Sequence, residues 1–129
     1  MTKKVFLDAN VLLEILCNRP KSNVCKEFFL DDETDLYVSI LTIHIVHYFA
    51  KKSGINLELT VELLKLCKVC KSSEIDYKKA LELYIFNKDL EDALQVAIAL
   101  NNSMDSLVTL DIDLVKKFSK KINLELVQL

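Results

Sequence analysis

Aspartate is the residue type in this sequence whose placement is best suited to chemistry. Five aspartates either follow an apolar run or open a predicted helix: Asp8, Asp89, Asp92, Asp111 and Asp113. Asp8 directly follows the apolar run Val5–Leu7, and Asp111 directly follows the run Ser106–Leu110. The pair that opens the predicted helix is spaced by three residues, which places both side chains on one side of its first turn.

A divalent metal ion is the partner that such a set of carboxylates would need. Like charges that crowd together repel and raise one another's pKa, and Arg19 is the only arginine in the sequence. Carboxylate oxygens without a matching set of histidines and cysteines suit Mg²⁺ or Mn²⁺ rather than zinc. Such an ion can activate water and stabilise the charge on a phosphate, which predicts hydrolysis of a nucleic-acid backbone.

Each aspartate also has a structural interpretation when it is considered alone. Asp8 could form an Asx turn or cap the helix that follows it. Asp89 could be an N-cap with Asp92 in the first turn, where the helix dipole favours a negative charge. Asp111 could cap the last helix, with Asp113 exposed to solvent. The metal interpretation therefore depends on the aspartates acting as a group.

Short strands alternating with helices must position these residues. Apolar runs predict strands over residues 5–7, 36–40, 68–72, 106–110 and 124–127. Apolar residues at helical spacing predict helices over residues 11–16, 22–30, 42–52, 57–67, 77–86, 90–101 and 113–120. Thr42 is the predicted N-cap of the third helix. This alternation favours an α/β fold with a parallel sheet, right-handed crossovers and helices on both faces.

The carboxyl edge of such a sheet is where chemistry is expected. In open parallel sheets, ligands bind beyond the carboxyl ends of the strands, next to a reversal of strand order. Asp8 and Asp111 follow predicted strands directly and therefore belong to this edge. Glu14 lies six residues after Asp8 on the helix that leaves the edge, where it could shape a cleft or face solvent.

The composition is typical of a single globular domain over residues 1–129. Hydrophobic residues make up 51% of the sequence and charged residues 28%, which is enough to form a core and a soluble surface. One glycine and one proline are too few for the tight turns of an all-β sandwich. A net charge of −2 argues against a purely electrostatic nucleic-acid binder, although a bound cation would supply local positive charge.

The cysteines and the apolar runs predict a cytoplasmic location. The four cysteines are Cys17, Cys25, Cys67 and Cys70, and the last two form a CxxC pair that stands alone. We expect buried apolar side chains here rather than a zinc site or a redox pair. The sequence shows no signal peptide and no apolar stretch of about 20 residues, so we expect reduced thiols and no contact with a membrane.

The order and spacing of these motifs resemble PIN domains, and among them the VapC-type ribonuclease toxins of toxin–antitoxin pairs. The resemblance covers nearly the whole chain through four segments: Val5–Leu13, Val38–Thr42, Asp89–Ala93 and Leu107–Asp113. It implies a three-layer α/β/α fold with a central, mainly parallel sheet. It also implies a Mg²⁺- or Mn²⁺-dependent endoribonuclease with an RNA substrate, an antitoxin protein as a partner, and a homodimer.

The resemblance assigns a role to each matching residue. The catalytic, metal-binding residues would be Asp8, Asp92 and Asp111, the last directly or through water. The secondary acidic groups would be Asp89 and Asp113. The supporting residues would be Asn10, which orients the first aspartate, and Thr109, which donates or accepts a hydrogen bond within the site.

One position departs from the family pattern. A helix residue that is usually acidic, and sometimes asparagine, corresponds to Ile45, which lies between His44 and His47. Isoleucine cannot bind a metal ion. An alternative hypothesis is therefore a catalytically degenerate PIN-like domain that acts as a protein-binding module. A third, a receiver-like or nucleotide-binding domain, is disfavoured because the sequence has no G-x-G-x-x-G motif and no lysine after its last strand.

Overall fold

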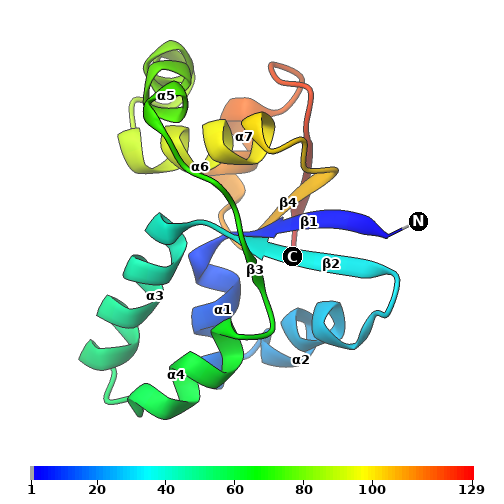
Figure 1. Cartoon of the computed structure of the whole chain (residues 1–129), viewed down its shortest axis with the longest axis vertical. Coiled ribbons are helices and arrows are strands. Elements are labelled where there is room, and N and C mark those ends of the chain that lie inside the picture. The colour runs from blue at the N-terminus through cyan, green and yellow to red at the C-terminus, as the bar shows by residue number, and fades with distance from the viewer. Residues whose placement is uncertain (1) are drawn as a thin grey trace.

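The computed structural model describes residues 2–129 and contains a five-stranded parallel sheet flanked by helices (Figure 1). The strands are β1 (Lys3–Leu7), β2 (Thr34–Val38), β3 (Lys68–Val69), β4 (Ser106–Thr109) and β5 (Glu125–Gln128). The helices are α1 (Ala9–Leu16), α2 (Ser22–Lys26), the 3₁₀ helix η1 (Glu27–Leu30), α3 (Ile40–Lys52), α4 (Leu57–Leu64), α5 (Glu74–Asn87), α6 (Leu90–Asn101) and α7 (Ile112–Phe118). The predicted alternation of strands and helices is confirmed.

Two hydrophobic clusters lie on opposite faces of the sheet. Val5 and Leu7 of β1 point into a cluster formed with α1, α3 and α4, whereas Phe6 points into a cluster formed with α5, α6 and α7. Leu107 and Val108 of β4 divide between the same two clusters. Because side chains alternate along a strand, both faces of the sheet are buried. The three-layer α/β/α fold is therefore confirmed, with α1 to α4 on one side and α5 to α7 on the other (Figure 1).

The strand order reverses between β1 and β4. The strands pair in the order β3-β2-β1-β4-β5, and every pair is parallel. The chain therefore moves outward from β1 to β3, crosses back through α5 and α6, and continues with β4 on the other side of β1. The backbone N–H of Asp8 donates to the carbonyl oxygen of Val108 at 3.0 Å. The carboxyl ends of β1 and β4 thus meet where ligands bind in sheets of this type.

The start of α3 differs from the prediction. Ser39, not Thr42, is the N-cap, and the two residues form a capping box. The Ser39 hydroxyl accepts from the Thr42 backbone N–H at 2.9 Å, and the Thr42 hydroxyl accepts from the Ser39 backbone N–H at 3.3 Å. This reciprocal bonding satisfies two donors and starts the helix at Ile40, so β2 ends at Val38, two residues earlier than predicted.

Glu14 does not face solvent, which corrects one of the two readings that the sequence allowed. Only 8% of the residue is exposed, and its Oε2 accepts from the backbone N–H of Lys21 at 2.9 Å. The Arg19 backbone N–H donates to the Glu14 carbonyl oxygen at 3.0 Å. The loop after α1 therefore folds back over Glu14, which anchors this loop at the far end of the helix from Asp8.

Three of the four cysteines are buried, as predicted. Cys25, Cys67 and Cys70 are buried and unpaired, while Cys17 is partly exposed. Burial raises the pKa of Cys67 to about 12 and that of Cys70 to about 11, so both thiols stay protonated near neutral pH. Within residues 2–129, no helix combines the length and the apolar character that crossing a membrane requires.

Candidate active site

The hydroxyl of Thr109 is the central hydrogen-bonding group at the ends of β1 and β4. It is fully buried, and it donates to Oδ2 of Asp8 at 2.7 Å. It accepts from Nδ2 of Asn10 at 3.2 Å and from the backbone N–H of Asp111 at 3.0 Å. A hydroxyl can donate one hydrogen bond and accept two, so the hydrogen-bonding capacity of Thr109 is completely used. The Thr109 side chain thus connects Asp8 and Asn10, which lie about 100 positions earlier in the sequence, to the backbone of Asp111.

Asp8 is held by donors on both of its carboxylate oxygens. Oδ1 accepts from the backbone N–H of Ala9 at 2.7 Å, which makes Asp8 the N-cap of α1. Oδ2 also accepts from Asn10 Nδ2 at 3.2 Å, and the side-chain Oδ1 of Asn10 accepts from the backbone N–H of Leu110 at 3.1 Å. Asn10 therefore bonds to Asp8 and links the end of β1 to the end of β4.

Burial nevertheless raises the pKa of Asp8 above its ordinary value. The loss of solvent is the largest cause, and the negative charges of Asp111 and Glu91 add to it. The hydrogen bonds from Thr109 and from the Ala9 backbone act in the opposite direction because they stabilise the ionised form. The leading causes of the shift include no lysine or arginine, so within residues 2–129 no protein cation largely offsets the charge of this carboxylate.

Asp111 caps α7, and its charge raises the pKa of Asp8. Its Oδ1 accepts from the backbone N–H of Asp113 at 2.9 Å and from that of Leu114 at 3.3 Å. Within residues 2–129, its Oδ2 accepts no hydrogen bond. Asp113 contributes its backbone N–H to this cap while its own side chain is exposed. The capping interpretation of Asp111 is confirmed, and it leaves one carboxylate oxygen available.

Asp92 has the most strongly perturbed carboxyl group of the site. Its pKa is raised to about 6, first by burial and then by the charges of Asp89, Asp8 and Asp111. A hydrogen bond from Asn87 Nδ2 to Asp92 Oδ2, at 2.8 Å, acts against this shift. The charges of Asp8 and Asp111, which follow β1 and β4, therefore act on the Asp92 carboxyl group of α6.

Asp89 and Glu91 surround Asp92 in the first turn of α6. Asp89 is the N-cap, and its Oδ1 accepts from the Asp92 backbone N–H at 3.1 Å. Burial and the charges of Asp89 and Asp92 raise the pKa of Glu91, and the charge of Glu91 in turn raises the pKa of Asp8. Our reading of the sequence missed Glu91, although three acidic residues within four positions could have indicated it.

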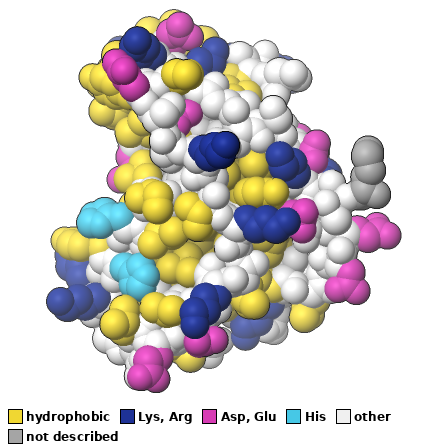
Figure 2. Space-filling view, in the orientation of Figure 1, with side chains coloured by type: hydrophobic (Ala, Val, Ile, Leu, Met, Phe, Trp, Pro, Cys, Tyr) yellow, Lys and Arg dark blue, Asp and Glu magenta, His cyan; other side chains and the backbone are white. Residues whose placement is uncertain are grey.

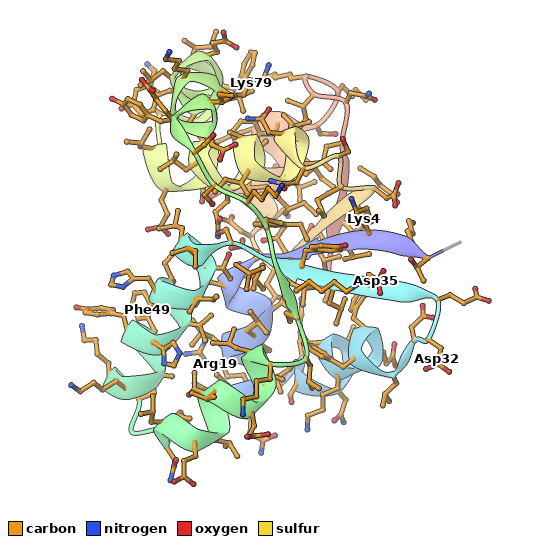
Figure 3. The ribbon with its side chains drawn as sticks, in the orientation of Figure 1. Lys4, Arg19, Asp32, Asp35, Phe49 and Lys79 are labelled. Atoms are coloured by element: carbon orange, nitrogen blue, oxygen red, sulfur yellow. The ribbon has the colours of Figure 1, made fainter. Side chains whose placement is uncertain are left out.

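The acidic residues are neighbours without forming a ready-made coordination shell. In the part of the chain that the structure describes, no group of three or more His, Cys, Asp or Glu side chains is placed to hold one metal ion. The chemistry of the donors still fits a hard divalent cation, because carboxylate oxygens are its preferred ligands and a positive charge would stabilise the ionised forms of Asp8 and Asp92, whose pKa values are raised. Arg19 cannot supply it, since it follows α1 at the end opposite to Asp8 (Figure 3).

Helix α3 adds no oxygen ligand at the position where the family pattern has one. Ile45 is partly buried and packs against the hydrophobic cluster under α1 and α3. His44 is exposed, and His47 lines a hollow of about 450 Å³ with Lys51, Ile55, Leu57 and Thr60. Figure 2 shows both histidines on the molecular surface, bordered by hydrophobic side chains. None of the acidic residues of the site lines that hollow.

Solved structures of toxin–antitoxin proteins share this fold. A chain in a toxin–antitoxin complex from Klebsiella pneumoniae is 20% identical, with a TM-score of 0.71, and the alignment covers 90% of this chain and 91% of that one. VapBC2 from Rickettsia felis, bound to a fragment of promoter DNA, is 19% identical, with a TM-score of 0.71 and 98% of both chains covered. VapC20 from Mycobacterium tuberculosis, a toxin that cleaves the sarcin–ricin loop, is 11% identical, with a TM-score of 0.72 and 87% and 93% covered.

The family follows from the sequence match. Among curated proteins, none matches the sequence of this chain. The sequence model of the PIN domain matches residues 5–120, a span that begins in β1 and ends after α7. It therefore includes the carboxyl edge of the sheet and every acidic residue described above. The chain belongs to the PIN domain family.

Proposed function

We propose that this protein is an endoribonuclease that hydrolyses RNA phosphodiester bonds with Mg²⁺ or Mn²⁺ and acts as the toxin of a toxin–antitoxin pair. The observation that carries the proposal is the gathering of Asp8, Asp92 and Asp111 at the switch point of the sheet, where burial and neighbouring negative charges raise the pKa values of Asp8 and Asp92. Membership of the PIN domain family supports the nuclease chemistry. The VapC20 structure, described as that of a toxin that cleaves the sarcin–ricin loop, supports RNA as the substrate class.

The residues at this site would have different roles in binding the cation. Asp8, Asp92 and Asp111 would hold the cation, with Asp89, Glu91 and Asp113 adding negative charge around them. A bound cation of this kind activates water and stabilises charge on the phosphate. Thr109 and Asn10 hold Asp8 Oδ2 in one orientation and favour the ionised form of the carboxyl group.

Proton release would accompany binding of the cation. Carboxyl groups must be ionised to bind a metal, and the pKa of Asp92 is about 6 in the metal-free protein. We therefore expect affinity for Mn²⁺ to rise with pH up to about pH 6 and then to level off. This expectation belongs to the metal-binding part of the proposal and does not require the RNA target to be known.

A second candidate function is a protein-binding module that has lost catalysis. Two observations favour it: Ile45 occupies the usually acidic position, and residues 2–129 contain no ready-made cluster of three ligands. This alternative expects negligible affinity for Mn²⁺ by titration calorimetry. Measurable Mn²⁺ binding that disappears in Asp92→Ala would contradict it.

Two protein partners belong to the proposal. Three of the similar structures are toxin–antitoxin complexes from Klebsiella pneumoniae, Rickettsia felis and Haemophilus influenzae, which supports an antitoxin partner.

A homodimer is supported by an apolar stripe along α5, where Tyr77, Leu81, Tyr84 and Ile85 are each at least 42% exposed. Residues at this spacing share one side of a helix. Sedimentation of the wild type and of Leu81→Lys would test the dimer.

A cleavage assay tests the enzymatic proposal. Purified protein is incubated with a panel of single-stranded and structured RNAs in Mn²⁺, in Mg²⁺ or in a chelator. We expect cutting that needs either metal and that falls to background in Asp8→Asn. Asparagine is as good an N-cap as aspartate, so this variant should keep α1 folded.

Asp32→Asn is the matched control for that assay. Asp32 is exposed in the loop between η1 and β2, away from the site (Figure 3). This variant removes the same charge and should cut as well as the wild type. Failure of the folded wild type to cut any RNA in either metal would refute the enzymatic proposal.

A further inference from the structure

Three buried polar side chains form a closed ring of hydrogen bonds between α3 and α6. The Ser39 hydroxyl lies 2.7 Å from Oε1 of Gln95, and Nε2 of Gln95 lies 2.7 Å from the Thr42 hydroxyl. The two hydroxyls lie 2.9 Å apart. All three residues are at most 3% exposed.

The ring has only one consistent direction of donation. Gln95 Nε2 donates to the Thr42 hydroxyl, and Ser39 donates to Gln95 Oε1, because an amide nitrogen only donates and an amide oxygen only accepts. The Thr42 hydroxyl must then donate to the Ser39 hydroxyl. A carboxamide supplies both a donor and an acceptor, which is what closes the ring. Neither leucine nor an ionised glutamate could replace it.

The ring lies between the two halves of the molecule. The body of α3 packs in the cluster with α1 and α4, whereas α6 packs on the opposite face of the sheet, chiefly against α5. Gln95 is three residues after Asp92, so it lies about one helical turn from that carboxylate. The ring therefore connects the helix that carries Asp92 to the residues that follow β2, next to β1 and Asp8.

We propose that Gln95 is a positioning residue that sets the place of Asp92 relative to Asp8. Its hydrogen bonds tie the first half of α6 to Ser39 and Thr42 across the sheet edge. The hydrogen bonds of the ring join Ser39, Thr42 and Gln95 and do not include the carboxylates. Gln95 therefore acts through the position of α6. The link to metal affinity rests on the proposed function, whereas the link to the geometry of Asp8 and Asp92 does not.

Gln95→Met is the variant that tests this role. Methionine has nearly the same length and volume as glutamine but can neither donate nor accept at those two atoms. Mn²⁺ affinity is measured by titration calorimetry, and crystal structures of the metal-free wild type and variant give the separation of Asp8 Cγ and Asp92 Cγ. We expect a wider separation and an affinity about 10- to 100-fold lower, the range for residues that orient metal ligands.

Asn101→Ala is the matched control at the other end of the same helix. Its Nδ2 donates to Asp76 Oδ1 at 2.8 Å, so this variant also removes a polar tie of α6, to α5 rather than to α3. We expect a lower melting temperature with unchanged Mn²⁺ affinity. If Gln95→Met does not fold, Thr42→Val keeps the shape of the side chain and removes the hydroxyl that accepts from Gln95 Nε2, without adding charge, and the same changes are expected.

The outcomes separate this inference from the proposed function. If the wild type binds Mn²⁺ and Gln95→Met binds it equally well, the positioning role is refuted and the metal site stands. If the wild type binds no Mn²⁺, the proposed function is refuted and the crystal structures decide the inference. An unchanged separation of Asp8 and Asp92 would then refute it, and a wider separation would support it.

Discussion

The candidate site has two halves that carry the same kind of charge but are held in different ways. The sheet-edge half consists of Asp8, Asn10, Thr109 and Asp111, and the helix half consists of Asp89, Glu91 and Asp92. In the sheet-edge half, one buried hydroxyl joins three neighbours, and Asp8 has donors on both oxygens. In the helix half, the Asp92 carboxylate has one donor among residues 2–129, Asn87.

The difference shows how a fold can prepare part of a charged site. Backbone pairing of β1 and β4 brings the sheet-edge half together, and its hydrogen bonds offset part of the cost of burying Asp8. The helix half depends on side-chain ties to α5 and α3, and the pKa of Asp92 rises to about 6. The sheet-edge half is therefore preorganised, whereas the helix half is the part that a bound cation would stabilise most.

Removing the Thr109 hydroxyl should give the largest loss of stability. Thr109→Val keeps the shape of the side chain but leaves the Asp8 carboxylate, the Asn10 amide and the Asp111 N–H each without one partner. Leaving buried polar groups unpaired costs about 1–3 kcal/mol. We expect the free energy of unfolding at pH 7 to fall by about 2 kcal/mol, measured by urea denaturation.

Thr109→Ser is the control for this substitution. Serine keeps the hydroxyl and loses one buried methyl group, which should cost about 1 kcal/mol. The valine variant should therefore be the less stable of the two. Equal stability of the two variants would show that the hydroxyl does not hold the sheet-edge half together.

Neutralising Asp92 should increase the stability of the metal-free protein, whereas removal of the Thr109 hydroxyl should lower it. The folded-state pKa of about 6 lies above the ordinary value of 3.8, so the folded state binds the proton more tightly. The resulting stabilisation is present below about pH 4 and is lost as the pH rises through 6. Asp92→Asn should therefore be more stable than the wild type at pH 7, by about 1 kcal/mol after solvent screening, and equal to it at pH 4.

Thermal unfolding at the two pH values, with and without Mn²⁺, measures this effect. Saturating Mn²⁺ should raise the melting temperature of the wild type and leave that of Asp92→Asn unchanged, because a ligand stabilises only the state that binds it. Asp32→Asn serves as the exposed control and should match the wild type throughout. Destabilisation by Asp92→Asn at pH 7 without metal would contradict the proposed crowding.

The sheet-edge half was accessible from the sequence, because it depends on local signals. Asp8 and Asp111 directly follow apolar strands, and parallel strands present their carboxyl ends at one edge. The residues that support them could be named only through the family resemblance. Their atomic roles needed the structure, because Asn10 and Thr109 lie 99 residues apart and meet only through the pairing of β1 with β4.

The helix half and the residues that hold it were harder to predict from the sequence, because they depend on tertiary contacts. Asn87 reaches Asp92 because α5 ends with Lys88 in the left-handed region, at φ 55°, where non-glycine residues are uncommon. The sequence gives no sign that Gln95 differs from a polar residue on the exposed side of a helix, whereas in the structure only 3% of it is exposed. Ser39 and Thr42 are both good capping residues, and only the backbone geometry shows which one starts α3.

Asp111 belongs to the sheet-edge half. Neutralising it should have two small and opposite effects on stability. Its side chain caps α7, and its charge raises the pKa of Asp8 and of Asp92. Asp111→Asn keeps a capping side chain and removes the charge. The lost attraction to the helix dipole and the relieved repulsion are each a few tenths of a kcal/mol to about 1 kcal/mol, so stability should change little.

Comparing Asp111→Asn with Asp111→Ala separates the cap from the charge. Alanine loses the cap as well, which should lower the free energy of unfolding by about 1 kcal/mol relative to asparagine. Both variants lack the carboxylate, so both should lose Mn²⁺ affinity to the same extent in calorimetry. If asparagine kept the affinity of the wild type, Asp111 would serve only as a cap, and the cation would depend on Asp8 and the helix half.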